Sequence, residues 1–367
     1  VIHLTILIRR INKINYELKM HVKLLVGLEG FDIIDEQKPK VHELGKFRLR
    51  PIGKKDLEFL KLISDPYLSV VLNYIAETEY ELNEDHFTIT VEELFPNLKN
   101  KNYTIREKDD IIYVDYGESR KGAVIKDLYL GHNLILDLPK ILAYSIEYKL
   151  WPLIAALHLY QTGYVNPFPT IIKIMRSDNV ETIPFTLGVH VFKESETIYY
   201  TVTKEKLNDF SKYVRKTFEV LKNIEDRLPF NYFLSGIMFS DLESSVMPFY
   251  DIKIALLDFI AGMESLFDIY SELQFRLSLY IAIALGHSYE ERKNYKDLIS
   301  KLYKIRSDIA HGVRVNEKED LDRLTREAEE ILRRLLNIYL NQYAMKGKTK
   351  KDFTKDIEKK LLGNNAV

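Results

Sequence analysis

The chain has 367 residues, a formal net charge of −1 at pH 7 and no cysteine. This length is enough for two domains of ordinary size. The near-zero charge excludes a protein that binds nucleic acid through its overall field, so any basic surface must be local. The lack of cysteine excludes disulfides, thiolate metal sites and cysteine nucleophiles, and it is typical of a reducing cytoplasm or of a chain that avoids heat-labile residues.

The N-terminal segment does not resemble a membrane or export signal. No apolar run reaches the roughly 18 residues of a membrane span. Arg9 and Arg10 follow the apolar stretch 1–11, whereas a secretory signal has its charges in front. We therefore expect a cytoplasmic protein with no membrane association. Because the chain starts at Val1 and Met20 offers another start, we expect residues 1–19 to be a non-native or mis-started extension.

Residues 20–203 are expected to form an α+β N-terminal domain with short antiparallel strands and a sensor, regulatory or substrate-selecting role. Apolar runs and alternation predict strands at 20–34, 46–52, 87–91, 111–116 and 123–125. Helical spacing predicts helices at 56–63, 68–76 and 146–160, the first two separated by Asp65 and Pro66. The runs 183–192 and 197–202 are typical of a hairpin.

Residues 204–345 are expected to form an all-α bundle of successive helices with short connections. Apolar residues three and four apart predict helices at 204–224, 249–270, 271–286, 295–311 and 316–343. Ser271 with Gln274 matches a capping box, which places the start of the third of these helices. The remaining segment, 346–367, is rich in lysine and is expected to be a flexible, solvated tail, or one that adds nonspecific RNA affinity.

Reactive side chains are concentrated at the end of the helix predicted over 295–311. Ser307 and Asp308 lie four and three residues before His311, and so share its face of the helix. Arg306 lies further around, although its long side chain can bend toward the same phosphate. Gly312 is typical of the residue that ends a helix.

This combination suits phosphate chemistry. An arginine can bind two phosphate oxygens and stabilise developing charge, and a histidine can take or give a proton near neutral pH. RNA carries its own nucleophile in the 2′-hydroxyl, so no metal or cofactor is expected. The structural alternative is that Arg306 forms a surface ion pair and His311 only caps the helix.

An ordered set of segments leads up to this helix end. It comprises Gly262–Phe267, Glu272 with Arg276, Ala284–Gly286 and Leu302–Gly312. The set resembles an Apea-like HEPN (higher eukaryotes and prokaryotes nucleotide-binding) domain over residues 251–343. That resemblance implies a dimerising all-α bundle and, for many members, a metal-independent RNase of toxin–antitoxin or antiviral systems.

The family motif is an arginine, a polar residue and, four to six residues after the arginine, a histidine. The resemblance therefore implies that Arg306 and His311 are catalytic. Ser307 takes the polar position, where asparagine or aspartate is the better match, and Asp308 can stand in one residue later.

Glu264 projects from or near the apolar stripe of the helix predicted over 249–270, where a carboxylate needs a partner. Arg306 is one partner, which would hold the guanidinium in position. Arg276 is the other, which would make a purely structural pair. Glu272 and Arg276, four residues apart, are expected to stabilise their own helix.

Together these features predict an endoribonuclease with an α+β N-terminal domain and a C-terminal HEPN-like bundle. It would cleave RNA by 2′-hydroxyl attack, leaving 2′,3′-cyclic phosphate and 5′-hydroxyl ends. The expected partners are an RNA substrate, a second copy of the chain bound through the helical domain, and a regulatory protein. The resemblance implies a role in antiviral defence or a toxin-type stress response. The alternative is a non-catalytic HEPN module that binds RNA, nucleotide or a protein partner.

Overall fold

The structure is a computed structural model. It describes residues 20–34, 40–44, 46–53, 74–82, 103–108, 111–116, 123–125, 146–163, 165–175, 180–185, 200–241, 248–269, 271–313 and 321–363. The chain divides into two compact units: one consists of 1–25, 78–150 and 171–184, and the other of 26–77, 151–170 and 185–367. The motif at Arg306 and all helices from residue 151 onward belong to the second unit. The expected strand at 87–91 and helix at 56–63 lie outside the described residues.

The described strands form three sheets. They are β1 (Met20–Glu29), β2 (Phe31–Ile34), β3 (His42–Leu44), β4 (Phe47–Pro51), β5 (Tyr74–Leu82), β6 (Tyr103–Lys108), β7 (Ile111–Tyr116), β8 (Ala123–Ile125), β9 (Asn166–Met175), β10 (Val180–Phe185) and β11 (Tyr200–Thr203). The order is β10-β9-β1-β5-β4-β3 in the largest sheet, β6-β7-β8 in a second and β11-β2 in a third. The pairs β3–β4, β4–β5, β6–β7 and β7–β8 are antiparallel, which confirms the α+β class.

Pairing between distant segments sets the structure at two places. The helix predicted over 68–76 is wrong for 74–76, because these residues begin β5 and pair with β4, with Ala76 opposite Leu49. Most of the predicted hairpin, 186–199, lies outside the described residues. Of its described ends, β11 pairs in parallel with β2, with Tyr200 opposite Phe31, and β10 lies beside β9. The Tyr200 ring stacks on Phe31 with centroids 5.6 Å apart, and both rings are fully buried.

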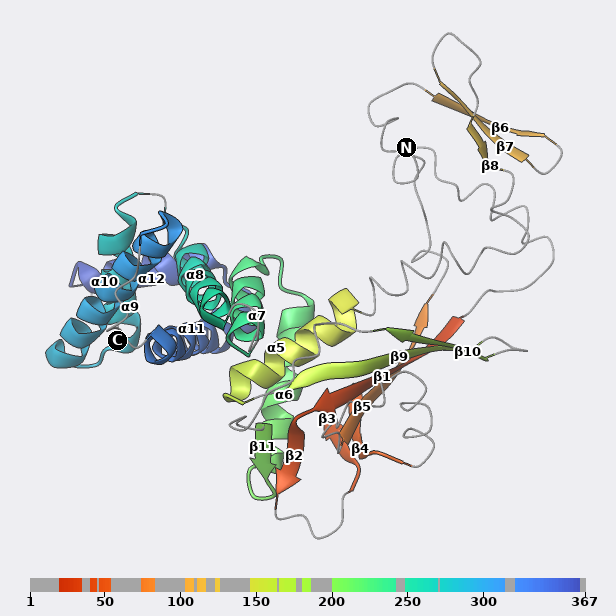
Figure 1. Cartoon of the computed structure of the whole chain (residues 1–367), viewed down its shortest axis with the longest axis horizontal. Helices are drawn as coiled ribbons and strands as arrows, with labels where there is room; N and C mark the ends of the chain where they lie inside the picture. Colours follow the sequence, from red (N-terminus) through yellow and green to blue (C-terminus); the bar gives the residue numbers. More distant parts are fainter. Residues whose placement is uncertain are drawn as a thin grey trace. The chain divides into compact units, whose positions relative to one another are not determined.

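The helices of the second unit are α5 (Trp151–Tyr160), α6 (Leu207–Lys222), α7 (Leu228–Asp241), α8 (Pro248–Phe267), α9 (Leu273–Leu285), α10 (Tyr289–Ala310), α11 (Leu321–Gln342) and α12 (Lys350–Leu361). Figure 1 shows α8 to α12 gathered into a bundle. A π-helical turn, η3 (Ile146–Leu150), precedes α5, and a 3-10 turn, η4 (Ala344–Lys346), follows α11. No helix in the described part of the chain is both long and apolar enough to cross a bilayer.

Helix starts depart from the predictions more than helix ends. α7 was not predicted, because its sequence is apolar on most sides and shows little periodicity. The capping box at Ser271 does not form; Glu272, with φ 50°, precedes α9, and Gln274 donates to the Ser300 carbonyl oxygen at 3.3 Å. α10 starts six residues earlier than predicted, because the Ser288 hydroxyl accepts from the Glu291 N–H at 3.1 Å.

The flexible tail predicted from residue 346 is wrong for 350–361, which form α12. Thr349 and Asp352 make a capping box at its start, and Phe353 and Ile357, one turn apart, are each 1 % exposed. The Lys350 ammonium is itself buried and reaches the Ser265 carbonyl oxygen at 2.6 Å. The predicted boundary at 203/204 falls inside one compact unit, because α6 packs on α5 and β3.

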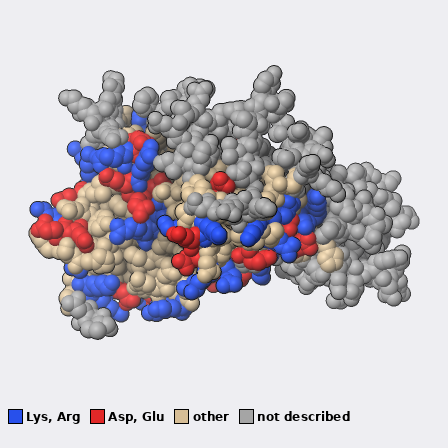
Figure 2. Space-filling model, turned by 90° about the horizontal axis from the view of Figure 1, so that it is seen from below, with Lys and Arg blue, Asp and Glu red and all other residues tan. Residues whose placement is uncertain are grey.

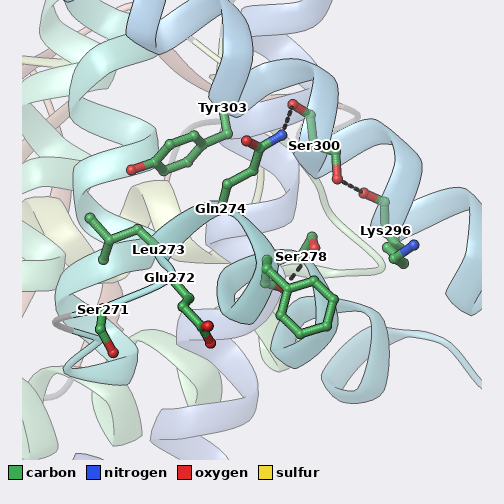
Figure 3. A pocket seen from close by; sticks show the side chains of 9 residues that line it. Ser271, Glu272, Leu273, Gln274, Ser278, Lys296, Ser300 and Tyr303 are labelled. Carbon is green, nitrogen blue, oxygen red and sulfur yellow. Dashed lines mark hydrogen bonds between the residues drawn. The ribbon is translucent and has the colours of Figure 1, made fainter.

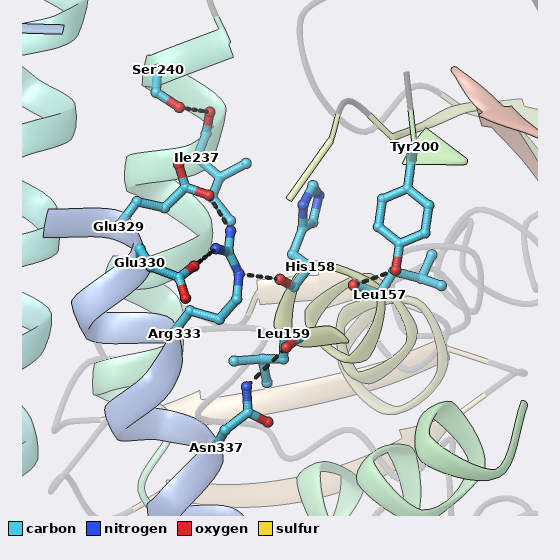
Figure 4. A network of polar contacts seen from close by, with 10 residues as sticks. All are labelled: Leu157, His158, Leu159, Tyr200, Ile237, Ser240, Glu329, Glu330, Arg333 and Asn337. Atoms are coloured by element: carbon cyan, nitrogen blue, oxygen red, sulfur yellow. Dashed lines mark hydrogen bonds and ion pairs between the residues drawn. The ribbon is translucent and has the colours of Figure 1, made fainter. Parts of the chain in front are cut away.

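A buried arginine ties α11 to α5 (Figure 4). The Arg333 guanidinium pairs with Glu329 and Glu330, and its Nε donates to the His158 carbonyl oxygen at 2.8 Å. One turn later, Asn337 donates to the Leu159 carbonyl oxygen at 2.9 Å. These carbonyls belong to the last turn of α5 and lack partners within that helix. The side chains of α11 therefore complete the hydrogen bonding of α5.

Candidate functional site

α8 packs closely on α11 at Gly262. A Cβ there would lie 2.6 Å from Leu332 Cδ2 and 3.3 Å from the Pro229 carbonyl oxygen, so a larger residue would require these neighbours to shift. Met263 and Leu266 are fully buried, whereas the Glu264 side chain keeps 17 % exposure. α8 thereby presents a carboxylate at the margin of the core, where α10 passes.

Arg306 on α10 is held by that carboxylate and by an aromatic ring. Its guanidinium lies 3.4 Å from Glu264 Oε2 and stacks over Tyr303 with 5.5 Å to the ring centroid. Of the two partners predicted for Glu264, the structure selects Arg306. Arg276 instead contacts Glu358 of α12 at 3.2 Å and the Tyr280 hydroxyl at 2.6 Å. The charge of Glu272 also acts on Arg276, as its spacing predicts, but the direct ion pair of Arg276 is with Glu358 on another helix.

The environment of this cluster opposes charge on the acid. Burial raises the pKa of Glu264, while the Arg306 charge and the Tyr303 hydroxyl act to lower it. Glu264 Oε1 is buried and has no hydrogen-bond partner among the described residues. Burial, and then the Glu264 charge, raises the pKa of Tyr303. The Arg306 side chain keeps 31 % exposure, so its guanidinium is oriented on one side and open to solvent on the other.

The helix end that carries His311 has the geometry the sequence predicts. His311 is the C-cap of α10, and Gly312 follows with φ 68°. The Gly312 N–H bonds the Ile309 carbonyl at 3.1 Å and the Val313 N–H bonds the Asp308 carbonyl at 2.8 Å, which is a Schellman motif. The His311 side chain is exposed and makes no hydrogen bond or ion pair with any residue that the structure describes. Its imidazole is therefore accessible for proton transfer.

The predicted site residues are only partly brought together. Arg306 and Glu264 are joined, whereas the Ser307 and Asp308 side chains are half-buried without a hydrogen bond or ion pair to any described residue. Residues five apart on a helix point about 140° away from one another. Arg306 is turned toward α8, so one chain does not place its guanidinium beside its own His311.

A groove lies between the start of α9 and the face of α10 that carries Tyr303 (Figure 3). It has a volume of about 560 Å³ and is bounded by the start of α9 and by Lys296, Ser300 and Tyr303 of α10. Phe275 of α9 lies at the groove with 58 % of its surface exposed. The spacing Lys296–Ser300–Tyr303–Ser307 keeps these residues on one helical face. The wall of the groove therefore continues toward the helix end.

The surface around the helices carries both signs of charge. Figure 2 shows Lys and Arg interspersed with Asp and Glu over the described part of the face in view. Contacts with a polyanion on that face would therefore be local rather than spread over a broad basic surface.

Two features of this site were not predicted. Tyr303 lies in the segment Leu302–Gly312, but its contact with Arg306 beside Glu264 was not expected; its spacing of three residues from Arg306 is the signal that could have indicated it. The groove was also missed, because it forms only where α9 and α10 pack together.

No family model, curated protein or solved structure matches this chain. The likeness to HEPN domains therefore depends on the quoted residues alone.

Proposed function

We propose that this protein is a HEPN-type endoribonuclease that cleaves RNA without a metal ion. The observation that supports it best is the Arg306 guanidinium, oriented by Glu264 and Tyr303 and open to solvent, on the helix that ends at an exposed His311. A cation held in advance of the reaction stabilises phosphorane charge more effectively than a mobile one. The partly unsatisfied Glu264 carboxylate supports a functional role over a merely structural ion pair.

In the proposed reaction, a His311 imidazole removes the proton from a ribose 2′-hydroxyl. The 2′-oxygen attacks the adjacent phosphorus, the bond from phosphorus to the 5′-oxygen breaks, and an imidazolium returns a proton to that oxygen. The products are a 2′,3′-cyclic phosphate and a 5′-hydroxyl. Arg306 binds the phosphate oxygens, Ser307 or Asp308 orients the substrate, and the groove beside Tyr303 leads the strand toward the site.

The proposal includes a homodimer that brings two helix ends together. Arg306 and His311 of one helix diverge by about 140°, so a site that uses both is completed more readily across two copies. An RNase with toxin-type or antiviral activity has to be kept under control by a regulatory partner. Within the proposal, residues 20–203 form the domain through which that control acts.

The decisive test is cleavage of a labelled single-stranded RNA in EDTA, with the termini identified by mass spectrometry. His311→Ala is expected to lower the rate about 1,000-fold, the usual size of a general acid–base contribution. Lys304→Ala, an exposed position on the same helix, is the matched control and should cleave like the wild type. Equal cleavage by wild type and His311→Ala would refute the catalytic assignment. RNA binding without cleavage by the wild type would favour the non-catalytic module.

Mixing two inactive variants tests whether the site is shared. A mixed dimer of Arg306→Ala and His311→Ala chains contains one intact site if the pair is contributed by two chains, and none if both groups come from one chain. Activity restored on mixing supports the shared site. Absence of restoration, with mixed dimers demonstrated by native mass spectrometry, would show that each chain acts alone.

A further inference from the structure

A second pocket lies at the opposite end of α10 from the motif. It has a volume of about 430 Å³ and is bounded by the end of α9, the turn before α10, α11 and α12. This size is within the range typical of small-molecule sites. Its apolar lining includes Ile338 of α11 and Phe353 and Ile357 of α12, of which Phe353 and Ile357 are 1 % exposed. The pocket therefore offers a partly aromatic, apolar floor.

Three basic side chains surround this floor. They are His287 from the turn before α10, Arg334 from α11 and Lys360 from α12, and the lining includes no aspartate or glutamate. None of the three forms an ion pair with a residue that the structure describes. The cationic side chains of Arg334 and Lys360, with the His287 imidazole beside them and no carboxylate in the lining, favour an anionic ligand.

Arg334 is oriented and not simply solvated. Its guanidinium donates to the Tyr295 hydroxyl and lies over that ring at 5.6 Å from the centroid. Two acids lie beside the pocket but outside its lining. Asp356 of α12 accepts a hydrogen bond from the Tyr343 hydroxyl at 3.2 Å and pairs with Lys359, and Glu291 is fully exposed. Its carboxylate accepts the His287 backbone N–H at 2.7 Å, and this bond is the main cause of its lowered pKa, with smaller effects from the His287 and Arg334 charges. Glu291 is therefore occupied with capping α10 and leaves the cationic groups available.

Two amides complete the wall. Asn337 uses both ends of its side chain on other elements, since it donates to the Leu159 carbonyl and accepts from the Tyr213 hydroxyl. The Gln342 amide is exposed and has no hydrogen-bond partner among the described residues. It can therefore hydrogen-bond the edge of a planar ring in a bound ligand. A ligand here would contact the same α11 residue, Asn337, that joins α11 to α5.

We propose that this pocket binds a nucleoside monophosphate. The flat base packs on the floor of Ile338, Phe353 and Ile357 and meets Gln342 at its edge, and the phosphate is bound by Arg334, Lys360 and His287. The proposal does not depend on the RNase assignment, because it uses none of the residues at the other end of α10.

Isothermal titration of the full chain with AMP tests it. Adenosine lacks the phosphate and inorganic phosphate lacks the ring, so each should bind at least about ten-fold more weakly than AMP. Arg334→Ala and Lys360→Ala should each weaken AMP binding about ten-fold, the effect of losing one charge-assisted hydrogen bond. Lys359→Ala and Arg326→Ala are matched controls, since these residues pair with Asp356 and Asp322 outside the pocket.

Melting temperatures separate binding from folding. Each variant should melt within about 2 °C of the wild type, because Arg334 and Lys360 are exposed. His311→Ala should bind AMP like the wild type, so loss of RNA cleavage and loss of AMP binding are distinguishable. AMP binding no tighter than that of adenosine or phosphate would overturn the proposal, as would equal weakening by the Lys359 and Lys360 variants.

Discussion

Two clusters in the helical region are built from the same kinds of side chain in opposite environments. The Arg333 guanidinium pairs with two glutamates and lies 5.6 Å from the centroid of the Phe233 ring, and its side chain is 5 % exposed. Its neighbour on α5 is His158. Arg306 has one glutamate and the Tyr303 ring at 5.5 Å, and its side chain is 31 % exposed. The helix of Arg306 ends at His311, which is exposed, whereas His158 is 5 % exposed.

The difference lies in what remains unsatisfied. Arg333 bonds two carboxylates and a backbone carbonyl, so this guanidinium has little capacity left for a ligand. At the motif, a glutamate oxygen lacks a described partner, and the guanidinium and imidazole face solvent. Burial with full pairing is typical of a structural cluster, whereas incomplete pairing at the surface is what the proposed catalytic role requires. Four substitutions test this contrast.

The largest effect is expected for Arg333→Met. It removes a buried guanidinium, 5 % exposed, together with its ion pairs to Glu329 and Glu330 and its hydrogen bond to the His158 carbonyl oxygen. We expect the free energy of unfolding to fall by about 4 kcal/mol, measured by urea denaturation. Arg326→Ala, which removes an exposed pair with Asp322, should change it by less than about 0.5 kcal/mol. A small effect of Arg333→Met would remove the structural assignment of this cluster.

His158 should make the free energy of unfolding depend on pH in the acidic range. Burial, and then the Arg333 charge, lowers its pKa from 6.5 to about 4. Between these values the unfolded chain binds more protons than the folded one, so stability is complete above pH 6.5 and is lost as pH falls toward 4. The loss attributable to His158 is about 3 kcal/mol. His158→Gln should flatten this part of the curve of unfolding free energy against pH, measured by urea denaturation at a series of pH values; an unchanged curve would contradict the assignment.

Arg306→Lys should slow cleavage and leave stability almost unchanged, which is the opposite of the expectation for Arg333→Met. Lysine keeps the charge beside Glu264 but cannot bind two phosphate oxygens in a fixed plane. We expect cleavage to slow about 100-fold, equivalent to about 2.7 kcal/mol, while the melting temperature changes by less than about 2 °C. Unchanged cleavage, or a variant that fails to fold, would show that Arg306 is structural like Arg333.

Glu264→Gln should have the smallest effect. The amide loses the ion pair but also removes a partly buried charge, so stability at neutral pH should change by less than about 1 kcal/mol. Cleavage should slow about ten-fold, because Arg306 is less firmly oriented. Because burial raises the pKa of Glu264, the folded wild type binds this proton more tightly, and its stability falls as pH rises through that range from 4.5. Glu264→Gln should not show this decrease in stability as pH rises.

Much of the helical half could be predicted from short-range pattern. The periodicity of α6, α8 and α11 and the stop at Gly312 follow from contacts within four or five residues, which the sequence displays directly. α7 and α12 were missed for opposite reasons. The first is apolar nearly all round, and the second has only two buried apolar residues among many charges.

At the motif, local spacing was enough to place His311 on the last turn of α10 and Ser307 and Asp308 on its face. The choice between Arg306 and Arg276 as the partner of Glu264 was not available from spacing, because both lie on other helices. It depends on how the helices pack, which brings Arg306 of α10 to Glu264 and Glu358 of α12 to Arg276.

Contacts within a few residues were sufficient to predict most helices, the helix end at Gly312 and the polar face of α10. The parallel pairing of β11 with β2, the contact of Arg333 with α5 and the two pockets, one beside Tyr303 and one before the start of α10, arise only when distant segments pack together. The Arg333 guanidinium and the His158 carbonyl oxygen, for example, belong to residues 175 positions apart that meet in the interior. Periodicity records which face of an element is buried, but not which partner covers it.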